Sequence, residues 1–478
     1  MSEKSNKKTV TIVVESVNRE LDNALLLKCE MERRGWDIRV MNKYEELRDT
    51  PTDVLVVPNC YNRADYEFYR YRFNCPSGRL VNLQYEQVLS PIEEDNELYS
   101  LDPVSKTITH TCWGRHTVER LTGKGVAAEN LPVTGAIQLD TTRPMFGPRW
   151  KTREEIAAEF GLEPEKKWIL YISTFATMAD GLINEAQKKG HTEENVDAFA
   201  AATELSQAET LDWFDRFIEE QENAYTIIYR PHPVELESPR VQAMRAKHPE
   251  AFRVIQDYEV KQWLRVADIP CTWISTAIAE SYFTGVNCLI LRPVPVPESI
   301  DCVIYKNCRA ARTFDEFKGQ IGGFERSFSR NREAEDGAFA EKQIAVNASF
   351  PIDSRLIEYY YDFSPEPAFR KIADVIEDEK TRVPENDIRL ADGAIIVGTS
   401  NFKAARKAYL KKSGIRAKLA VKKIYRTWYG ATGIKLKNEK LRSKLFVEEW
   451  EKTVDNRINS KALIAAKEAE FRRILENG

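Results

Sequence analysis

The chain has 478 residues, of which 42% are hydrophobic and 30% are charged, and its formal net charge is −4. This composition is typical of a globular protein with two or three domains and argues against a disordered chain. The slight negative charge argues against a general nucleic-acid binder. Eight scattered cysteines and five histidines form no zinc motif, so a reducing cytoplasm is the simplest setting. We expect neither a signal peptide nor a transmembrane helix, because no apolar stretch is long enough.

The first 148 residues alternate predicted strands with predicted helices. A β-branched strand begins at Thr9, and the helical pattern after it starts at Leu21 and ends at Gly35. Further strands are expected at 37–41, 53–57, 79–83 and 108–114, and further helices at 66–73 and 115–121. This order predicts βαβ units and a parallel sheet, in a Rossmann-like domain over residues 1–148. No Gly-x-Gly-x-x-Gly follows the first strand, so the dinucleotide-binding fingerprint is absent.

A second Rossmann-like domain is predicted over residues 149–365. Its first strand, 168–172, ends in Ser173-Thr174, and a polar helical insert over 181–208 precedes a helix over 209–221. The other strands are expected at 225–229, 252–255, 269–274 and 287–291, and the other helices at 152–160, 260–267 and 277–283. Prolines, glycines and Ser-Thr pairs mark the ends of these elements.

Two of these strand ends indicate a phosphate site. The apolar run Tyr225–Tyr229 stops at Arg230-Pro-His-Pro233, which places Arg230 and His232 at the carboxyl end of a strand, where open α/β sheets bind ligands. An arginine fork and an imidazole both suit phosphate, although a solvent-exposed basic strand end is the alternative. The strand at 269–274 turns into a helix through Ser275-Thr276, which aims N–H groups and a helix dipole at one point. The alternative there is an ordinary helix cap.

The C-terminal part differs in composition from the two domains. A helix with its linker, 366–398, is predicted to cross back to the first domain, and 399–478 form a basic helical tail. Between residues 401 and 440 lysines and arginines alternate with aliphatic and aromatic residues, and Glu439 is the single acidic residue. This pattern favours an amphipathic helix on an anionic membrane surface. A helix docked on the protein itself and an RNA-binding arm are the alternatives.

Two Rossmann-like domains without a dinucleotide fingerprint suggest a GT-B glycosyltransferase, and particular residues carry a closer resemblance. The chain resembles bacterial surface carbohydrate biosynthesis proteins, in a group with polysialyltransferases, capsule Kdo transferases and CDP-glycerol glycerophosphotransferases. The matching residues are Val14-Glu-Ser-Val-Asn-Arg-Glu-Leu-Asp22, Glu86, Trp113-Gly114, Val133-Thr-Gly135, Arg230-Pro-His-Pro233, Ala267-Asp268, Ser275-Thr276 and Glu280. The resemblance covers roughly residues 9 to 380. The chain departs from the group at Ala136-Ile-Gln138 and at the glutamines that flank Glu86.

The resemblance implies a GT-B fold, with two Rossmann-like domains that face a cleft, and assigns roles to residues at predicted strand ends. The nucleotide and phosphates of the donor would be bound in the second domain, and the catalytic acid or base would come from the first. The expected donor residues are Ser173, Thr174, Arg230, His232, Ser275, Thr276 and Glu280, with Glu280 near the ribose. The expected catalytic candidates are Glu15, Glu20 and Glu86, and the expected acceptor or cleft residues are Arg19, Asn59, Tyr61 and Gly135. For Glu15 and Glu20 an ion pair with Arg19 is the alternative, and for His110 and His116 a surface or core position.

The expected function is transfer of a sugar from a nucleotide-activated donor, of the CMP or CDP type, to a lipid-linked or glycan acceptor. No Asp-x-Asp pair occurs in the chain, which fits a transferase that binds phosphate without a metal or other cofactor. The expected location is the cytoplasmic face of the cell membrane. Alternatives are a CDP-polyol phosphotransferase, a sugar-nucleotide 2-epimerase and a non-catalytic nucleotide-sugar-binding scaffold.

Overall fold

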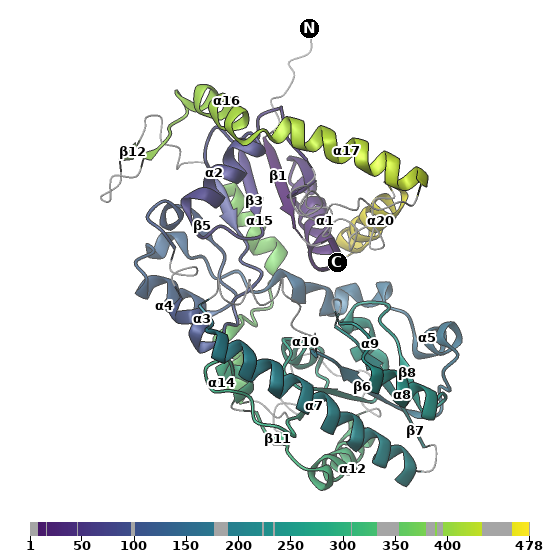
Figure 1. Ribbon diagram of the computed structural model, residues 1–478. Helices are drawn as coiled ribbons and strands as arrows, with labels where there is room; N and C mark the ends of the chain where they lie inside the picture. The colour runs from purple at the N-terminus through teal and green to yellow at the C-terminus, as the bar shows by residue number, and fades with distance from the viewer. Residues whose placement is uncertain are drawn as a thin grey trace. The chain divides into compact units, whose positions relative to one another are not determined.

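The computed structural model folds into two compact units (Figure 1). The first unit comprises Met1–Gln87, Ser100–Asp140 and Tyr361–Gly478, and the second comprises Val88–Tyr99 and Thr141–Tyr360. The change of unit falls between Asp140 and Thr141, whereas the sequence placed it after residue 148. The structure describes residues 8–15, 17–44, 46–96, 101–175, 190–221, 224–232, 235–306, 308–331, 353–378, 388–389, 395–432 and 461–477.

The first unit is built on a parallel five-stranded sheet with strand order β2-β1-β3-β4-β5. Its strands are β1 (Thr9–Val14), β2 (Asp37–Asn42), β3 (Val54–Val57), β4 (Leu80–Asn82) and β5 (Thr109–His110). Its helices are α1 (Val17–Arg33), α2 (Arg63–Arg72), α4 (Arg115–Gly123), α15 (Ala368–Asp378), α16 (Phe402–Ser413), α17 (Ile415–Thr432) and α20 (Lys461–Asn477). A two-stranded antiparallel ribbon joins β12 (Ile388–Arg389) to β13 (Ile395–Ile396).

The second unit is built on a parallel six-stranded sheet with strand order β11-β10-β9-β6-β7-β8. Its strands are β6 (Lys167–Ile172), β7 (Tyr225–Arg230), β8 (Phe252–Val254), β9 (Ile269–Thr272), β10 (Leu289–Leu291) and β11 (Ala310–Ala311). Its helices are α3 (Pro91–Asp95), α5 (Arg153–Phe160), α7 (Glu193–Glu220), α8 (Pro239–Lys247), α9 (Val260–Val266), α10 (Ala277–Thr284), α11 (Val303–Lys306), α12 (Phe314–Asn331) and α14 (Ser354–Tyr360).

Alternating side chains of this second sheet enter two different cores. Ile169 and Tyr171 pack with α7, α8 and α12, whereas Trp168, Leu170 and Ile172 pack with α5, α9 and α10. Because both faces of a parallel sheet are covered by helices, its strands are continuous hydrophobic runs rather than alternating ones. The predicted α/β class with two Rossmann-like units is confirmed. A cleft between the units stays a prediction.

The predicted boundary between a polar insert and the helix that follows it is wrong. A polar insert over 181–208 and a separate helix over 209–221 were expected, but one helix, α7, runs through Glu193–Glu220. Thr192 caps it through a hydrogen bond from the backbone N–H of Asn195, so the polar residues after it form the solvent face of a long helix. Residues 181–189 of the expected insert lie outside the described residues.

The basic tail contributes helices to the first unit. The Arg406 guanidinium donates to the carbonyls of Tyr71 and Arg48, and the rings of Phe402 and Tyr409 lie 5.7 and 5.1 Å from that of Tyr71. The helix α16 is therefore docked on α2, as one of the alternatives for the tail expected. The expected closing helix is α20, which packs on α1 through the ion pairs Lys467–Asp22 and Lys28–Glu468. No described helix is long and apolar enough to span a membrane.

Candidate functional site

Three adjacent strands of the second sheet, β9, β6 and β7, end at one edge in polar residues. Thr174 follows β6, Arg230 ends β7, and Ser275-Thr276 follow β9 at the start of α10. Two polar atoms of this set, Oγ1 of Thr174 and Nε of Arg230, are buried without a hydrogen-bond partner among the described residues. Buried polar atoms in folded proteins are nearly always paired, so unpaired ones grouped at a ligand-binding edge indicate a ligand.

The turn after β7 is held by a buried carboxylate that the sequence reading did not single out. Glu235 accepts hydrogen bonds from the Ser173 hydroxyl at 2.6 Å, from the Tyr229 hydroxyl and from the backbone N–H of His232 at 3.0 Å. Ser173 is 2% exposed and also contacts the Tyr229 hydroxyl, so its oxygen ties β6 to β7. The predicted contact of Ser173 with the donor stays a prediction. The His232 side chain is exposed to solvent.

Among the described residues, one hydrogen bond orients the Arg230 guanidinium. Its Nη2 donates to the carbonyl of Tyr258 at 2.7 Å. Tyr258 has φ of 64°, a conformation that is uncommon for a residue other than glycine and is concentrated at functional sites. Burial lowers the pKa of Arg230, and the negative charges of Glu280, Glu259 and Asp257 oppose that shift. The group nevertheless stays a cation, because an arginine pKa lies far above neutral pH.

The N-terminus of α10 differs from the expected open cradle of N–H groups. The N–H of Ala277 bonds the Ser275 hydroxyl at 3.2 Å, the N–H of Ile278 bonds the Ser275 carbonyl, and that of Ala279 bonds the Thr276 carbonyl. These three backbone N–H groups, which were expected to meet a phosphate, are therefore already hydrogen-bonded within the turn. Thr276 is exposed and makes no capping hydrogen bond, so its hydroxyl and the helix dipole are what the turn offers an anion.

Glu280, one turn along α10, has a perturbed acidity. Burial raises the pKa of its carboxyl to about 7, with the Glu259 charge acting in the same direction and the charges of Lys261 and Arg230 opposing it. Lys261 is 6% exposed and its ammonium lies 3.1 Å from a Glu259 oxygen. This edge of the sheet therefore carries two cations, Arg230 and Lys261, and two carboxyl groups, those of Glu259 and Glu280. Perturbed pKa values such as that of Glu280 cluster at functional sites.

The Glu280 carboxyl gives a pH-dependence that can be measured on the free protein. Its folded pKa of about 7 lies above the ordinary value of 4.5, so the stability it contributes is full below pH 4.5 and is lost as pH rises through 7. Replacing Glu280 with glutamine removes this loss. The difference in Tm between E280Q and wild type should therefore be about 2–4 °C more positive at pH 8.5 than at pH 5.5. This shift corresponds to ~1 kcal/mol in the free energy of unfolding.

The exposed Glu298, which pairs with Lys306 at 3.1 Å, provides the control for this measurement. E298Q should follow wild type at every pH by differential scanning calorimetry. A difference between E280Q and wild type that does not change with pH would contradict the titration of Glu280 in this range.

In the first unit, Glu15 follows β1 and is surrounded by donors. Its Oε1 lies 2.8 Å from the Lys43 ammonium and accepts from the Tyr44 hydroxyl, and its Oε2 accepts from Asn59 Nδ2 at 2.6 Å. These partners lower the pKa of Glu15 against the opposing effect of burial, the largest single influence. Glu15 and Asn59, both predicted site residues, are thus brought together. The alternative partner for Glu15, Arg19, is wrong.

Of the other two glutamates, Glu86 lies on the surface and Glu20 inside. Glu20 is 2% exposed and accepts a hydrogen bond from the backbone N–H of Glu15 at 2.7 Å. A carboxylate that is buried and bonded to the turn helps to shape the loop, and a catalytic role for Glu20 stays a prediction. Arg19 lies 3.8 Å from Glu86, and both side chains are largely exposed.

The remaining predicted residues of the first unit make contacts other than with the Glu15 carboxylate. The backbone N–H of Tyr61 donates to Asp65, and Gly135 has φ of 80° and lies against Ala368 and Asp362. His110 is fully buried between Asn82 and the carbonyl of Ser105, and burial lowers its pKa to about 4. It is therefore a neutral core histidine, as one of its two alternatives expected, and His116 is 9% exposed.

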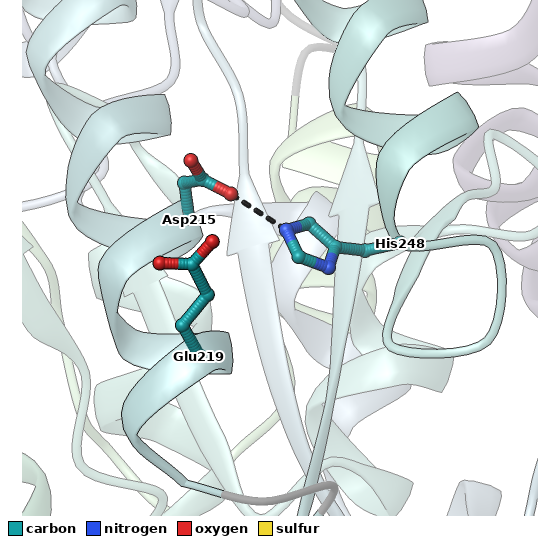
Figure 2. Close-up of side chains that lie close together, drawn as sticks. All are labelled: Asp215, Glu219 and His248. Atoms are coloured by element: carbon teal, nitrogen blue, oxygen red, sulfur yellow. Dashed lines mark hydrogen bonds and ion pairs between the residues drawn. The ribbon is translucent and has the colours of Figure 1, made fainter.

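A possible cation cluster lies away from these edges, on α7 and at the end of α8 (Figure 2). Ligand atoms of Asp215, Glu219 and His248 lie within 4.8 Å of one another, and His248 Nε2 lies 2.6 Å from Asp215. The Lys247 ammonium bonds both carboxylates, at 2.7 and 2.8 Å. The Lys247 ammonium therefore occupies the position in which a metal ion would bind, and the cluster is an ion-pair network on the helix surface.

Comparison with known proteins gives a distant similarity of fold. No family model and no curated protein matches the chain. Among solved structures, S. aureus MnaA with UDP is 13% identical with a TM-score of 0.46, covering 79% of this chain and 99% of that one. The wall teichoic acid polymerase TagF is 11% identical with a TM-score of 0.49, covering 78% and 89%. UDP-GlcNAc 2-epimerase from Neisseria meningitidis, bound to UDP-GlcNAc, is 11% identical with a TM-score of 0.45, covering 77% and 100%. Similarity of this degree says nothing of substrate or reaction.

Proposed function

We propose that this protein transfers a sugar from a nucleotide-activated donor to a lipid-linked or glycan acceptor in bacterial surface polysaccharide synthesis. The observation that carries the proposal is the edge of the second sheet, where Arg230 Nε and Thr174 Oγ1 are buried without hydrogen-bond partners among the described residues. The Glu280 carboxyl, whose pKa burial raises to about 7, lies near Arg230 at the same edge. A phosphate at this edge would accept from Arg230 and from the Thr276 hydroxyl, and the ribose would meet Glu280.

In this proposal the leaving phosphate is stabilised by fixed charges of the protein. Arg230 is already positioned by the Tyr258 carbonyl, and the dipole of α10 adds partial positive charge near Thr276. Donors that are in place before the reaction cost no reorganisation when charge develops on the leaving group. His232 is exposed beside them, and in this proposal its imidazole is a further hydrogen-bond donor to the phosphate. The proposal requires no metal ion.

Glu15 is the preferred base of the first unit in this proposal. Its carboxylate is ionised at neutral pH, is 28% exposed, and is oriented by Lys43 and Asn59. Its lowered pKa makes it a weak base, so in this proposal it accepts the proton of the acceptor hydroxyl only as that oxygen bonds to the sugar and the nucleotide phosphate leaves. Glu86 is more exposed than Glu15, at 46% of its side chain, and it pairs with the exposed Arg19 at 3.8 Å.

The proposal is tested by heating the protein with intact CMP-, CDP- and UDP-activated sugars. A donor at 100 times its Kd stabilises the folded state by about 2.7 kcal/mol, which raises Tm by several degrees. We expect one class of donor to do this for wild type and to do so less for His232→Ala. Release of nucleotide on addition of a lipid-linked glycan acceptor then measures transfer. If no donor class shifts Tm, the proposed function is wrong.

A further inference from the structure

The first unit contains a pocket of about 220 Å³ between α2 and the basic tail. Its walls are apolar and aromatic, formed by Phe68, Tyr409 and Leu419 among others. Its polar lining includes three cationic side chains, Arg72 from α2 and Lys418 and Lys422 from α17. A small concave site with apolar walls and convergent cations suits an anion that is joined to an apolar group.

Arg72 is the member of the pocket that points most clearly to a ligand. Its side chain is 3% exposed, its Nε donates to the Glu46 carbonyl at 2.7 Å, and its Nη2 is buried without a partner among the described residues. The guanidinium stacks over the Phe68 ring at 5.2 Å, and burial lowers its pKa to about 10. A cation buried without an ion pair is costly, and an anion that enters the pocket relieves that cost.

The outer face of α17 carries an apolar stripe. Val421, Ile424 and Trp428 are 46%, 69% and 38% exposed, and the exposed Ala417 and Ala420 share their side of the helix. Large apolar side chains at this spacing, on a helix outside the core, are typical of a surface that meets another phase or molecule.

The flanks of the stripe are basic. Arg416 and Lys423 are exposed on one side of it and Lys418 on the other, and the sequence from 402 to 432 contains no aspartate or glutamate. Arg416 pairs with the exposed Asp49 at 2.5 Å, but α17 itself supplies only cations beside the stripe. An apolar stripe with cations on the same helix favours an anionic lipid surface over an acidic protein groove, because acyl chains meet the stripe and head groups meet the cations. The helix α17 therefore contributes residues both to the lining of the pocket and to the exposed apolar stripe.

We infer that α17 lies on an anionic membrane and that the pocket binds the terminal phosphate of a lipid head group, through Arg72 and Lys418. The guanidinium fork meets two phosphate oxygens, the lysine a third, and the aromatic walls exclude water. Val421, Ile424 and Trp428 enter the lipid interface. Tyr44 also lines the pocket, and its hydroxyl donates a hydrogen bond to Glu15. The inference needs no nucleotide and stands apart from the proposed function.

Vesicle co-sedimentation with the full chain tests the inference. Three compositions are compared: phosphatidylcholine alone, phosphatidylcholine with phosphatidylglycerol, and phosphatidylcholine with phosphatidic acid at equal surface charge. We expect little binding to the first and a preference of about fivefold or more for phosphatidic acid, because a terminal phosphate can enter the pocket and a glycerol-capped one cannot. Inorganic phosphate alone should raise Tm less than phosphatidic acid vesicles do.

Matched variants separate the pocket from general attraction. Arg72→Gln should abolish the preference for phosphatidic acid and keep binding to phosphatidylglycerol. Arg72→Lys, which can be used if the glutamine variant does not fold, should weaken the preference. Ile424→Ser with Trp428→Ser should lower binding to both anionic vesicles about tenfold or more. Lys407→Ala, exposed on α16 outside the pocket, should lower both equally.

Three results would overturn the inference. They are equal binding to all three compositions, a preference for phosphatidic acid that survives in both Arg72 variants, and stabilisation by inorganic phosphate equal to that by vesicles. Tighter binding to a single-stranded RNA than to anionic vesicles would likewise replace it with the RNA-binding alternative.

Discussion

Replacing Arg230 with alanine should lower kcat/KM for transfer by about 10²- to 10³-fold, the usual loss when one preorganised donor to a developing charge is removed. The Arg230 guanidinium is the best-positioned cation at the edge of the second sheet, with its Nη2 on the Tyr258 carbonyl and its Nε unpaired. Alanine leaves a donor phosphate without this fork, so we expect both weaker donor binding and slower transfer. Isothermal titration with the donor and steady-state kinetics measure the two effects separately.

Arg230→Lys and Arg240→Ala are the matched variants for this experiment. Lysine keeps the charge but loses the fork, so it should recover only part of the activity. Arg240 is exposed on α8, and its loss should leave donor binding unchanged. Donor affinity within twofold of wild type in R230A would remove Arg230 from the donor site and with it the observation on which the proposed function rests.

Much of the fold could be predicted because most of its strands are buried and end sharply. The expected strand at 225–229 is β7, and Pro231 follows its last residue, Arg230. Gly285, which was expected to end the helix at 277–283, has φ of 69°, a conformation that favours glycine. Local chemistry sets these ends, so they are readable from a single sequence. The helix α7 was predicted as two segments because its solvent face is polar over many turns.

The candidate site was predicted less well because its partners are distant in sequence. The sequence placed Arg230 and Thr276 at strand ends, but nothing local shows that Glu235 would bond the hydroxyls of Ser173 and Tyr229. The position of Glu235 within Arg230-Pro-His-Pro-Val-Glu235 was the available signal. The partner of Glu15, Lys43, comes from the end of the adjacent strand β2, and its contact depends on the parallel register of β1 with β2. Register is a tertiary property that spacing alone does not give.

Replacing Asp301 with alanine should destabilise the second unit by about 3–5 kcal/mol, the cost of leaving a buried charge without its partner. Arg292 and Asp301 are 4% and 6% exposed, and they form a bidentate pair at 2.6 and 2.8 Å. Arg292 directly follows β10, and its backbone N–H bonds the carbonyl of Ala311 in β11. The pair therefore fixes the 292–301 loop to the edge of the sheet, and D301A leaves the Arg292 guanidinium enclosed and unpaired.

Urea denaturation measures this loss, and two further variants decide its cause. Glu298→Ala removes a carboxylate of the same loop that pairs with Lys306 on the surface, and it should cost no more than about 1 kcal/mol. The double variant R292M/D301L replaces the pair with apolar side chains and should be clearly more stable than D301A, because no charge is then buried alone. If the double variant is as unstable as D301A, packing of the loop rather than the uncompensated arginine sets the cost. If D301A loses less than 1 kcal/mol, the guanidinium reaches water and the pair is not part of the core.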